Sequence, residues 1–249
     1  MSTSLIYITA PFVVAYLVII GNFSNNELVN FFVYQVFIIG YLIFIGLSDI
    51  KMYLKKGNKS WFQLIFLGIL LYFIEVYLSL IINFLSPSKN VQGVSHFTYS
   101  LKYFFLVKSY QPIFIAISEE ILKLFTFLAF LGFIKKNDMR GIIFSSILSS
   151  LVFGLLHNIN YSNTAFIIIG LSTIPSFLFL VISKSIYPLL ISHFLFDFVA
   201  FLAHVQNSSL YVQILLLVLV TSLIPLSFAY IDSLYKNKSN NLTQNTIKH

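Results

Sequence analysis

The chain has 249 residues, of which 58% are hydrophobic and only 9% are charged, and its formal net charge is +7. A soluble domain carries roughly 25% charged residues, so the composition excludes a soluble globular protein and indicates an integral membrane protein. The chain has no cysteine, which excludes disulfides and a thiol nucleophile, and it has no glycine-rich phosphate loop or basic–aromatic patch that would indicate a nucleic-acid partner.

The apolar runs predict an all-α polytopic bundle of about eight transmembrane helices, because about 20 apolar residues cross the hydrocarbon core as a helix. We expect one transmembrane domain over residues 1–235, with the residues that carry chemistry in 112–200, and a polar tail over 236–249 whose composition predicts disorder. The expected spans are about 5–21, 30–48, 61–85, 112–134, 141–159, 163–182, 187–205 and 209–231.

Two of the connections have a distinct composition. Residues 158–163 form a short polar turn between the fifth and sixth spans. The long connection of residues 86–111 contains an aromatic stretch with interleaved lysines, Leu101 to Tyr110. This stretch fits either an amphipathic helix lying in the membrane interface or an ordinary loop in the aromatic belt.

Basic residues divide unevenly between the two sides of the predicted bundle. Eight spans place eleven on the side of the N-terminus and three on the other, with Lys123 inside a span. Positive charge in short loops marks the cytoplasmic side, so both termini are expected in the cytoplasm. The eleven are Lys51, Lys55, Lys56, Lys59, Lys135, Lys136, Arg140, Lys184, Lys236, Lys238 and Lys248, and the three are Lys89, Lys102 and Lys108.

Two adjacent acidic residues, Glu119 and Glu120, lie inside the fourth span. A carboxylate at that depth costs about 2.5–3.5 kcal/mol on insertion scales, so ionisable groups there indicate function. Lys123 follows at helical spacing and can neutralise one carboxylate. The alternative is a Glu–Lys pair that only makes the helix insertable, but the second glutamate then adds cost without a partner.

Two later spans contribute polar groups at similar positions. His157 lies near the end of the fifth span, four residues after Phe153, and His193 precedes Asp197 by one turn in the seventh. Taken singly, His157 could anchor the interface, and His193 with Asp197 could form a self-satisfied pair. At about 1.5 Å per residue, Glu119 and His157 reach similar depths, whereas His193 needs a tilted or shifted span to join them.

Together these residues resemble the CPBP family, intramembrane proteases that include the CAAX prenyl endopeptidases and bacterial bacteriocin-processing and self-immunity proteins. The family pattern is a double Glu followed by Arg, then FxxxH, then HxxxN or HxxxD, and the order matches over residues 112–200. Where the family places Arg the chain has Leu124, and Lys123 comes one residue sooner. That spacing is similar to the related PrsW-like proteases, but those have Glu where His157 stands.

The resemblance implies an intramembrane endopeptidase, with catalytic residues Glu119, Glu120, His157, His193 and Asp197. Glu119 would activate water and His157 would hold it, while His193 and Asp197 would stabilise the oxyanion and Glu120 would tie the helix through Lys123. The family has been described both as metal-dependent and as glutamate proteases. A metal-free site without cofactor is expected, because no ligand pair has HExxH spacing, and zinc held by His157, His193 and one Glu is the alternative.

The expected partners are membrane lipid and a membrane-associated peptide or protein substrate, with no nucleic acid. The Asn-, Lys- and Ile-rich composition favours a bacterial plasma membrane. A different class of function would also keep a polar intramembrane cavity, namely a non-catalytic bacteriocin self-immunity protein or a transporter.

Overall fold

The computed structural model describes residues 3–20, 25–57, 59–85, 98–135, 138–158 and 165–246, and gives only the backbone of residues 158, 165 and 236–246. Within them the fold is all-α, as expected, and the described residues form no strand beyond one isolated bridge between Tyr99 and Val205. The helices are α1 (Thr3–Tyr7), α2 (Thr9–Ile20), α3 (Glu27–Tyr53), α4 (Trp61–Leu85), α5 (Leu101–Tyr103), the π-helix η1 (Phe104–Lys108), α6 (Gln111–Ile134), α7 (Met139–Asn158), α8 (Ala165–Ser172), α9 (Ile174–Ser183), α10 (Tyr187–Ala203) and α11 (Ser209–Thr246).

The eight expected spans correspond to α1 with α2, α3, α4, α6, α7, α8 with α9, α10 and α11. Six of these segments in the described chain are long and apolar enough to cross a membrane, and α10 is a shorter apolar helix. The remaining segment, α6, carries three charged residues at its middle, Glu119, Glu120 and Lys123. The protein is therefore an integral membrane protein built as a polytopic helical bundle.

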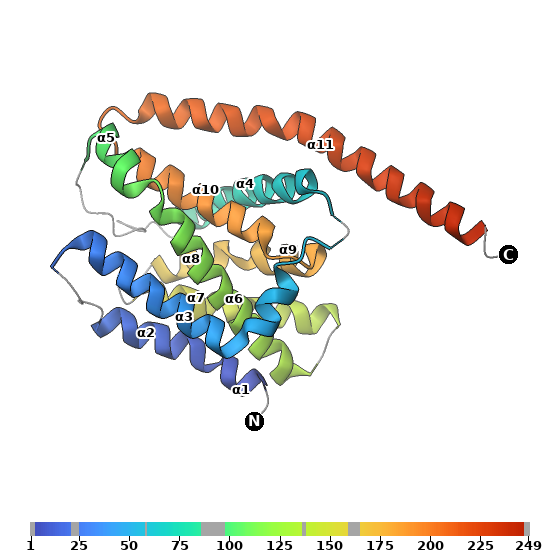
Figure 1. The fold of residues 1–249 in the computed structure, drawn as a ribbon, viewed down its shortest axis with the longest axis horizontal. Coiled ribbons are helices and arrows are strands. Elements are labelled where there is room, and N and C mark those ends of the chain that lie inside the picture. The colour runs from blue at the N-terminus through green and yellow to red at the C-terminus, as the bar shows by residue number, and fades with distance from the viewer. Residues whose placement is uncertain are drawn as a thin grey trace.

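Successive segments run in opposite directions, so their ends gather on two sides (Figure 1). We call the near side the one that holds the start of α1, the end of α3 and start of α4, the end of α6 and start of α7, and the end of α9 and start of α10. The far side holds the end of α2 and start of α3, the end of α7 and start of α8, and the end of α10 and start of α11, together with α5. Figure 1 shows the near-side ends of α3, α4, α9 and α10 on the right of the bundle and the far-side helix ends on the left.

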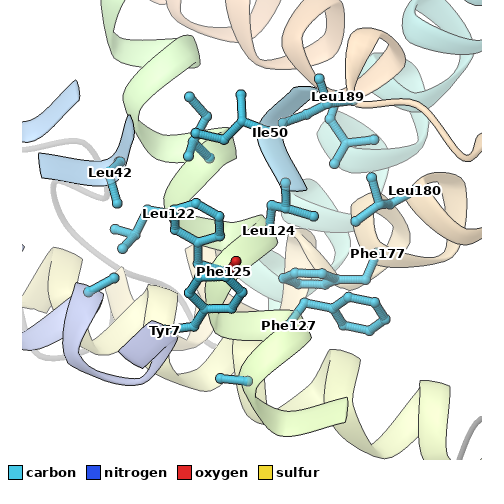
Figure 2. Packing of buried hydrophobic residues seen from close by; sticks show 14 of the residues in the cluster. Tyr7, Leu42, Ile50, Leu122, Leu124, Phe125, Phe127, Phe177, Leu180 and Leu189 are labelled. Atoms are coloured by element: carbon cyan, nitrogen blue, oxygen red, sulfur yellow. The ribbon is translucent and has the colours of Figure 1, made fainter. Parts of the chain in front are cut away.

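Helix α6 lies at the centre and is contacted by α1, α2, α3, α7 and α10. Its buried side chains form the middle of the main apolar cluster, in which Phe125 stacks on Tyr7 and Phe127 on Phe177 (Figure 2). Helix α3 kinks at Gly46, where a Cβ would lie 2.2 Å from the Phe125 ring. The absence of a side chain there lets α3 close over the central helix that carries both glutamates.

Three connecting or terminal segments bear on the sequence-based expectations. The stretch from Leu101 to Tyr110 is α5 and η1, and Phe104 is fully buried against Phe198, so the segment is anchored to α10 rather than only resting in the interface. Residues 86–97 and residues 159–163 of the predicted turn lie outside the described residues, and Asn158 is the last residue of α7.

The tail differs from its predicted disorder, because the backbone of α11 continues as a helix to Thr246 and projects from the bundle (Figure 1). Extending an existing helix avoids the cost of nucleation and adds one hydrogen bond per residue. Composition alone does not register that continuity with a preceding apolar helix.

Candidate active site

The structure brings Glu119 and both histidines together. Glu119 Oε2 lies 3.4 Å from His193 Nε2 and 3.7 Å from His157 Nε2. The three side chains come from α6, α10 and α7, which are far apart in sequence. Side-chain exposures of 28%, 12% and 18% leave each group reachable from a cavity although it is mostly covered.

The approach of His193 depends on where α10 begins. The α9–α10 turn is recessed into the protein, with Ser183, Ser185 and Ile186 all buried. The Ile186 N–H donates to the carbonyl of Tyr53, the last residue of α3, at 2.9 Å, which ties the turn to the end of that helix. The contacts of His193 with Glu119 and Glu120 show that α10 is shifted or tilted against α6, as the depth argument required.

Glu120 points away from Glu119 into the protein and is 1% exposed. Its Oε1 atom accepts a hydrogen bond from His193 Nδ1 at 2.6 Å and forms an ion pair with Lys123. A buried carboxylate needs such partners, since an unpaired buried charge is strongly destabilising. Glu120 therefore links α6 to α10, in addition to making its expected contact with Lys123.

Phe153 and His157 form one unit on α7. His157 Nδ1 lies 2.9 Å from the Phe153 carbonyl oxygen, and the two rings are 4.5 Å apart. The Phe153 ring also lies 4.8 Å from Lys123 Nζ, in cation–π geometry. The four-residue spacing thus orients the imidazole and places an aromatic face against the buried ammonium.

Asp197 lies one turn beyond His193, with Oδ2 at 3.5 Å from His193 Nε2. Among the described residues this oxygen is buried without a hydrogen-bond partner. The carboxylate that holds His193 by a hydrogen bond is thus Glu120, and Asp197 stands beside the ring nitrogen that faces Glu119.

Glu75 on α4 is a further buried carboxylate, for which the sequence suggested no role. It accepts hydrogen bonds from Ser176 and, at 2.6 Å, from Ser192, and it interacts electrostatically with Lys123. Lys123 therefore lies between two buried carboxylates from different helices. The sequence signal was an acidic residue in an apolar span, but its partners are serines far along the chain.

The ionisable side chains described above, except that of Glu120, line one partly open cavity of about 930 Å³. Ligand pockets typically have volumes of about 300–1,000 Å³, so this one is large enough for a segment of peptide. Its other walls are mainly apolar side chains of α2, α3, α7, α8 and α10. The arrangement offers a carboxylate, two imidazoles and a sheltered space for a substrate bond.

Residues 96–199 match a family model described as Rce1-like, type II CAAX prenyl endopeptidase Rce1-like. The resemblance to the CAAX-type proteases is confirmed. The matched region contains all five predicted catalytic residues, whereas Glu75 lies outside it. No curated protein and no solved structure matches the chain. The match supports a CAAX-type intramembrane protease in general, and it leaves the PrsW-like alternative as an unconfirmed second choice.

Proposed function

We propose that the protein is an intramembrane endopeptidase in which Glu119 activates a water molecule for attack on a peptide carbonyl. The observation that carries this proposal is the position of Glu119 Oε2, which lies within 3.7 Å of both imidazole Nε2 atoms in a shared cavity. The proposed mechanism places a water at hydrogen-bonding distance from Glu119 Oε2 and both Nε2 atoms. The family match supports the same class of reaction.

The hydrogen bonds of the two histidines indicate where protons reside. A backbone carbonyl only accepts, so His157 Nδ1 carries the hydrogen in its contact with Phe153. A neutral His157 then presents Nε2 as an acceptor toward Glu119. The water can therefore donate one hydrogen to Glu119 and the other to His157, which aims its oxygen lone pairs at the substrate.

The reaction then follows from these positions. The water oxygen bonds to the carbonyl carbon while its proton passes to Glu119, and the carbonyl oxygen becomes an oxyanion. The protonated Glu119 next gives this proton to the amide nitrogen as the carbon–nitrogen bond breaks. The products are a carboxylic acid and an amine, which exchange a proton to become a carboxylate and an ammonium group, and Glu119 returns to its starting state.

In this mechanism His193 donates Nε2–H to the oxyanion. Its Nδ1–H is already given to Glu120, so His193 acts as an imidazolium. Asp197 is a carboxylate at 3.5 Å from that nitrogen and acts through His193. Glu120 and Lys123 are positioning residues, since they touch His193 and each other rather than the reacting atoms.

We propose further that the reaction needs no metal or cofactor. No group of three His, Cys, Asp or Glu side chains in the described part of the chain is arranged to hold a metal ion. Loss of activity on chelation, with recovery on added zinc, would favour the zinc alternative instead.

The proposed setting is a bacterial plasma membrane with both termini in the cytoplasm, which the distribution of basic residues supports. The proposed partners are membrane lipid and a membrane-associated peptide or protein. Nucleic acid has no place in this proposal.

The deciding experiment replaces Glu119 with Gln in protein purified into lipid nanodiscs and measures cleavage of a set of fluorogenic apolar peptides, with and without a prenyl group. Removing a general base typically costs about 10²–10⁴-fold in rate, so kcat/KM is expected to fall by that factor. The matched control is Glu27→Gln, an exposed glutamate paired with Lys108 at the far side, which is expected to leave the rate unchanged. Circular dichroism checks that both variants are folded.

Undiminished cleavage by Glu119→Gln would exclude this mechanism. If the wild-type protein cleaves none of the peptides while both proteins confer the same protection on cells, the non-catalytic immunity function would replace the proposal.

A further inference from the structure

The cavity lies in one half of the bundle, the half toward the far side. Most of its lining residues come from the far-side portions of the segments that contribute. Leu122, Lys123 and His193 lie near the middle of α6 and α10, and Ser172 and Thr173 lie at the junction of α8 and α9, near the middle of that segment. On α4 they are Glu75, Ser79, Leu80 and Asn83, which approach the far-side end of that helix.

Helical rise gives the depth of Glu119. Eight residues separate Glu119 from the far-side start of α6, which is about 12 Å at 1.5 Å per residue. Fifteen residues separate it from the near-side end, which is about 22 Å. Glu119 is therefore closer to the far side, and His157, next to last in α7, is closer still.

The far-side edge of the cavity carries polar side chains among its apolar ones. Asn83, Thr98 and His204 line the cavity at the far-side ends of their segments, and Thr98 is exposed. From the near side, the buried ion pair of Glu120 with Lys123 and the apolar cluster around Phe125 lie across the path to Glu119. Water and polar groups can therefore enter the cavity from the far side.

Gln35 gives a second indication of what the cavity receives. It lines the cavity from α3, is 5% exposed, and its Oε1 atom has no hydrogen-bond partner among the described residues. A buried acceptor without a partner costs about 1–3 kcal/mol, and a peptide N–H entering the cavity would satisfy it. Asp197 Oδ2 is a second buried acceptor of this kind in the cavity. A mainly apolar cavity with two such acceptors among the described residues fits an extended peptide segment.

The charges assign the far side to a compartment. The spans expected from the sequence assign eleven basic residues to the side of the N-terminus, which is the near side, and three to the other. Positive charge in short loops then makes the near side cytoplasmic. We propose that the cavity opens to the extracytoplasmic side, and that its substrate is a membrane-anchored peptide segment exposed on that face. Only the description of the bound peptide as a substrate rests on the proposed function. The direction in which the cavity opens does not depend on it.

The test uses introduced cysteines, because the chain has none of its own. Ser79→Cys and Asn83→Cys place a thiol in the cavity, and Lys56→Cys places one on the exposed near side. Tyr77→Cys is the matched control, because Tyr77 lies on α4 at the depth of Ser79, is 68% exposed, and does not line the cavity. Each variant is treated with a membrane-impermeant sulfonated maleimide in spheroplasts, before and after permeabilisation.

We expect complete labelling of Ser79→Cys and Asn83→Cys in intact spheroplasts, with no further gain on permeabilisation. Lys56→Cys is expected to label only after permeabilisation, and Tyr77→Cys to stay unlabelled because it faces lipid. Labelling of both cavity cysteines only after permeabilisation would show a cytoplasmic opening, and labelling of neither in any condition would show a closed cavity; either result overturns the proposal. The assay needs no turnover, so its outcome is independent of the Glu119→Gln experiment.

Discussion

Glu120 holds His193 by the ring nitrogen that faces away from Glu119, with Oε1 2.6 Å from Nδ1. The same oxygen is paired with Lys123, and both Glu120 and Lys123 are almost fully buried. One carboxylate thus fixes the imidazole and neutralises the ammonium. The two adjacent glutamates have different tasks: Glu119 faces the cavity, while Glu120 connects α6 with α10.

We therefore predict that substitutions of Glu120 and Lys123 have strongly coupled effects on the free energy of unfolding. Breaking a buried ion pair by removing one partner costs about 3–5 kcal/mol, so Glu120→Gln and Lys123→Met are each expected to destabilise the protein by that amount. The double variant is expected to cost less than the sum, because neither member of the Glu120–Lys123 pair is then left without the other. Denaturant unfolding in detergent, followed by circular dichroism, measures the double-mutant cycle.

The surface pair of Lys108 with Glu27 is the control for this cycle, because Glu27 is exposed. Exposed pairs contribute about 0–1 kcal/mol, so Glu27→Gln and Lys108→Met should have small effects. Additive losses for Glu120 and Lys123 would contradict the prediction.

Phe153 is predicted to matter through its ring as well as its carbonyl oxygen. The ring contacts both the Lys123 ammonium and the His157 imidazole, and a desolvated cation–π contact is worth about 2 kcal/mol. Phe153→Leu is therefore expected to lower the free energy of unfolding by about that amount and to lower kcat, because His157 loses its support. Phe144→Leu, a lipid-facing change on the same helix at a residue 54% exposed, is expected to change neither.

The sequence predicted the parts of the site that depend on helical spacing. Glu120 with Lys123, Phe153 with His157, and His193 with Asp197 each lie within about one turn of a single helix, so their proximity can be read from their positions. The helical bundle followed from composition for the same reason, since long apolar runs have few alternatives in lipid.

The parts that depend on contacts between distant segments were not predictable in this way. Glu75 is held by Ser176 and Ser192, and nothing in the sequence marks two serines as partners of one carboxylate. The recessed start of α10 depends on the backbone hydrogen bond from Ile186 to Tyr53. The choice of Glu120 rather than Asp197 as the hydrogen-bond partner of His193 depends on how α10 is rotated against α6.

Gly154 permits the close contact of α7 with α8 that places His157. A Cβ at Gly154 would lie 2.2 Å from the backbone oxygen of Phe166 and 3.0 Å from Gly170 Cα. Backbone atoms cannot turn aside as a side chain can, so Gly154→Ala must separate the helices. Overpacking of this kind costs about 1–3 kcal/mol, and we expect Gly154→Ala to lower both the stability of the protein and kcat.

The control is Gly40 on α3, where a Cβ meets nothing within 4 Å. Gly40→Ala should instead stabilise the protein by about 0.5–1 kcal/mol. Equal effects at the two glycines would contradict this account.

Lys184 and Lys135 form a matched pair at the near side, since each caps a helix in the left-handed region, with φ of 52° and 53°. Glycine adopts this conformation without the Cβ penalty of about 1–2 kcal/mol, so Lys184→Gly and Lys135→Gly should both stabilise the protein. Lys184 differs in its neighbourhood: burial and the charge of Lys184 lower the pKa of Lys59, which donates a hydrogen bond to the Ser183 carbonyl at 2.8 Å.

Lys184→Gly is therefore expected to stabilise more than Lys135→Gly at pH 7, because it also removes the repulsion of Lys59. The sign of the pH effect follows from the lowered pKa. The folded state binds the Lys59 proton less tightly than the unfolded state, so this penalty is full at neutral pH and fades as pH rises toward about 10.4, the ordinary lysine pKa. The excess stabilisation should shrink over that range, and also in 1 M salt, which screens exposed charges. Unfolding midpoints at pH 7 and pH 10.5 measure the difference, and an excess that is unchanged by pH and salt would show that repulsion of Lys59 is not its cause.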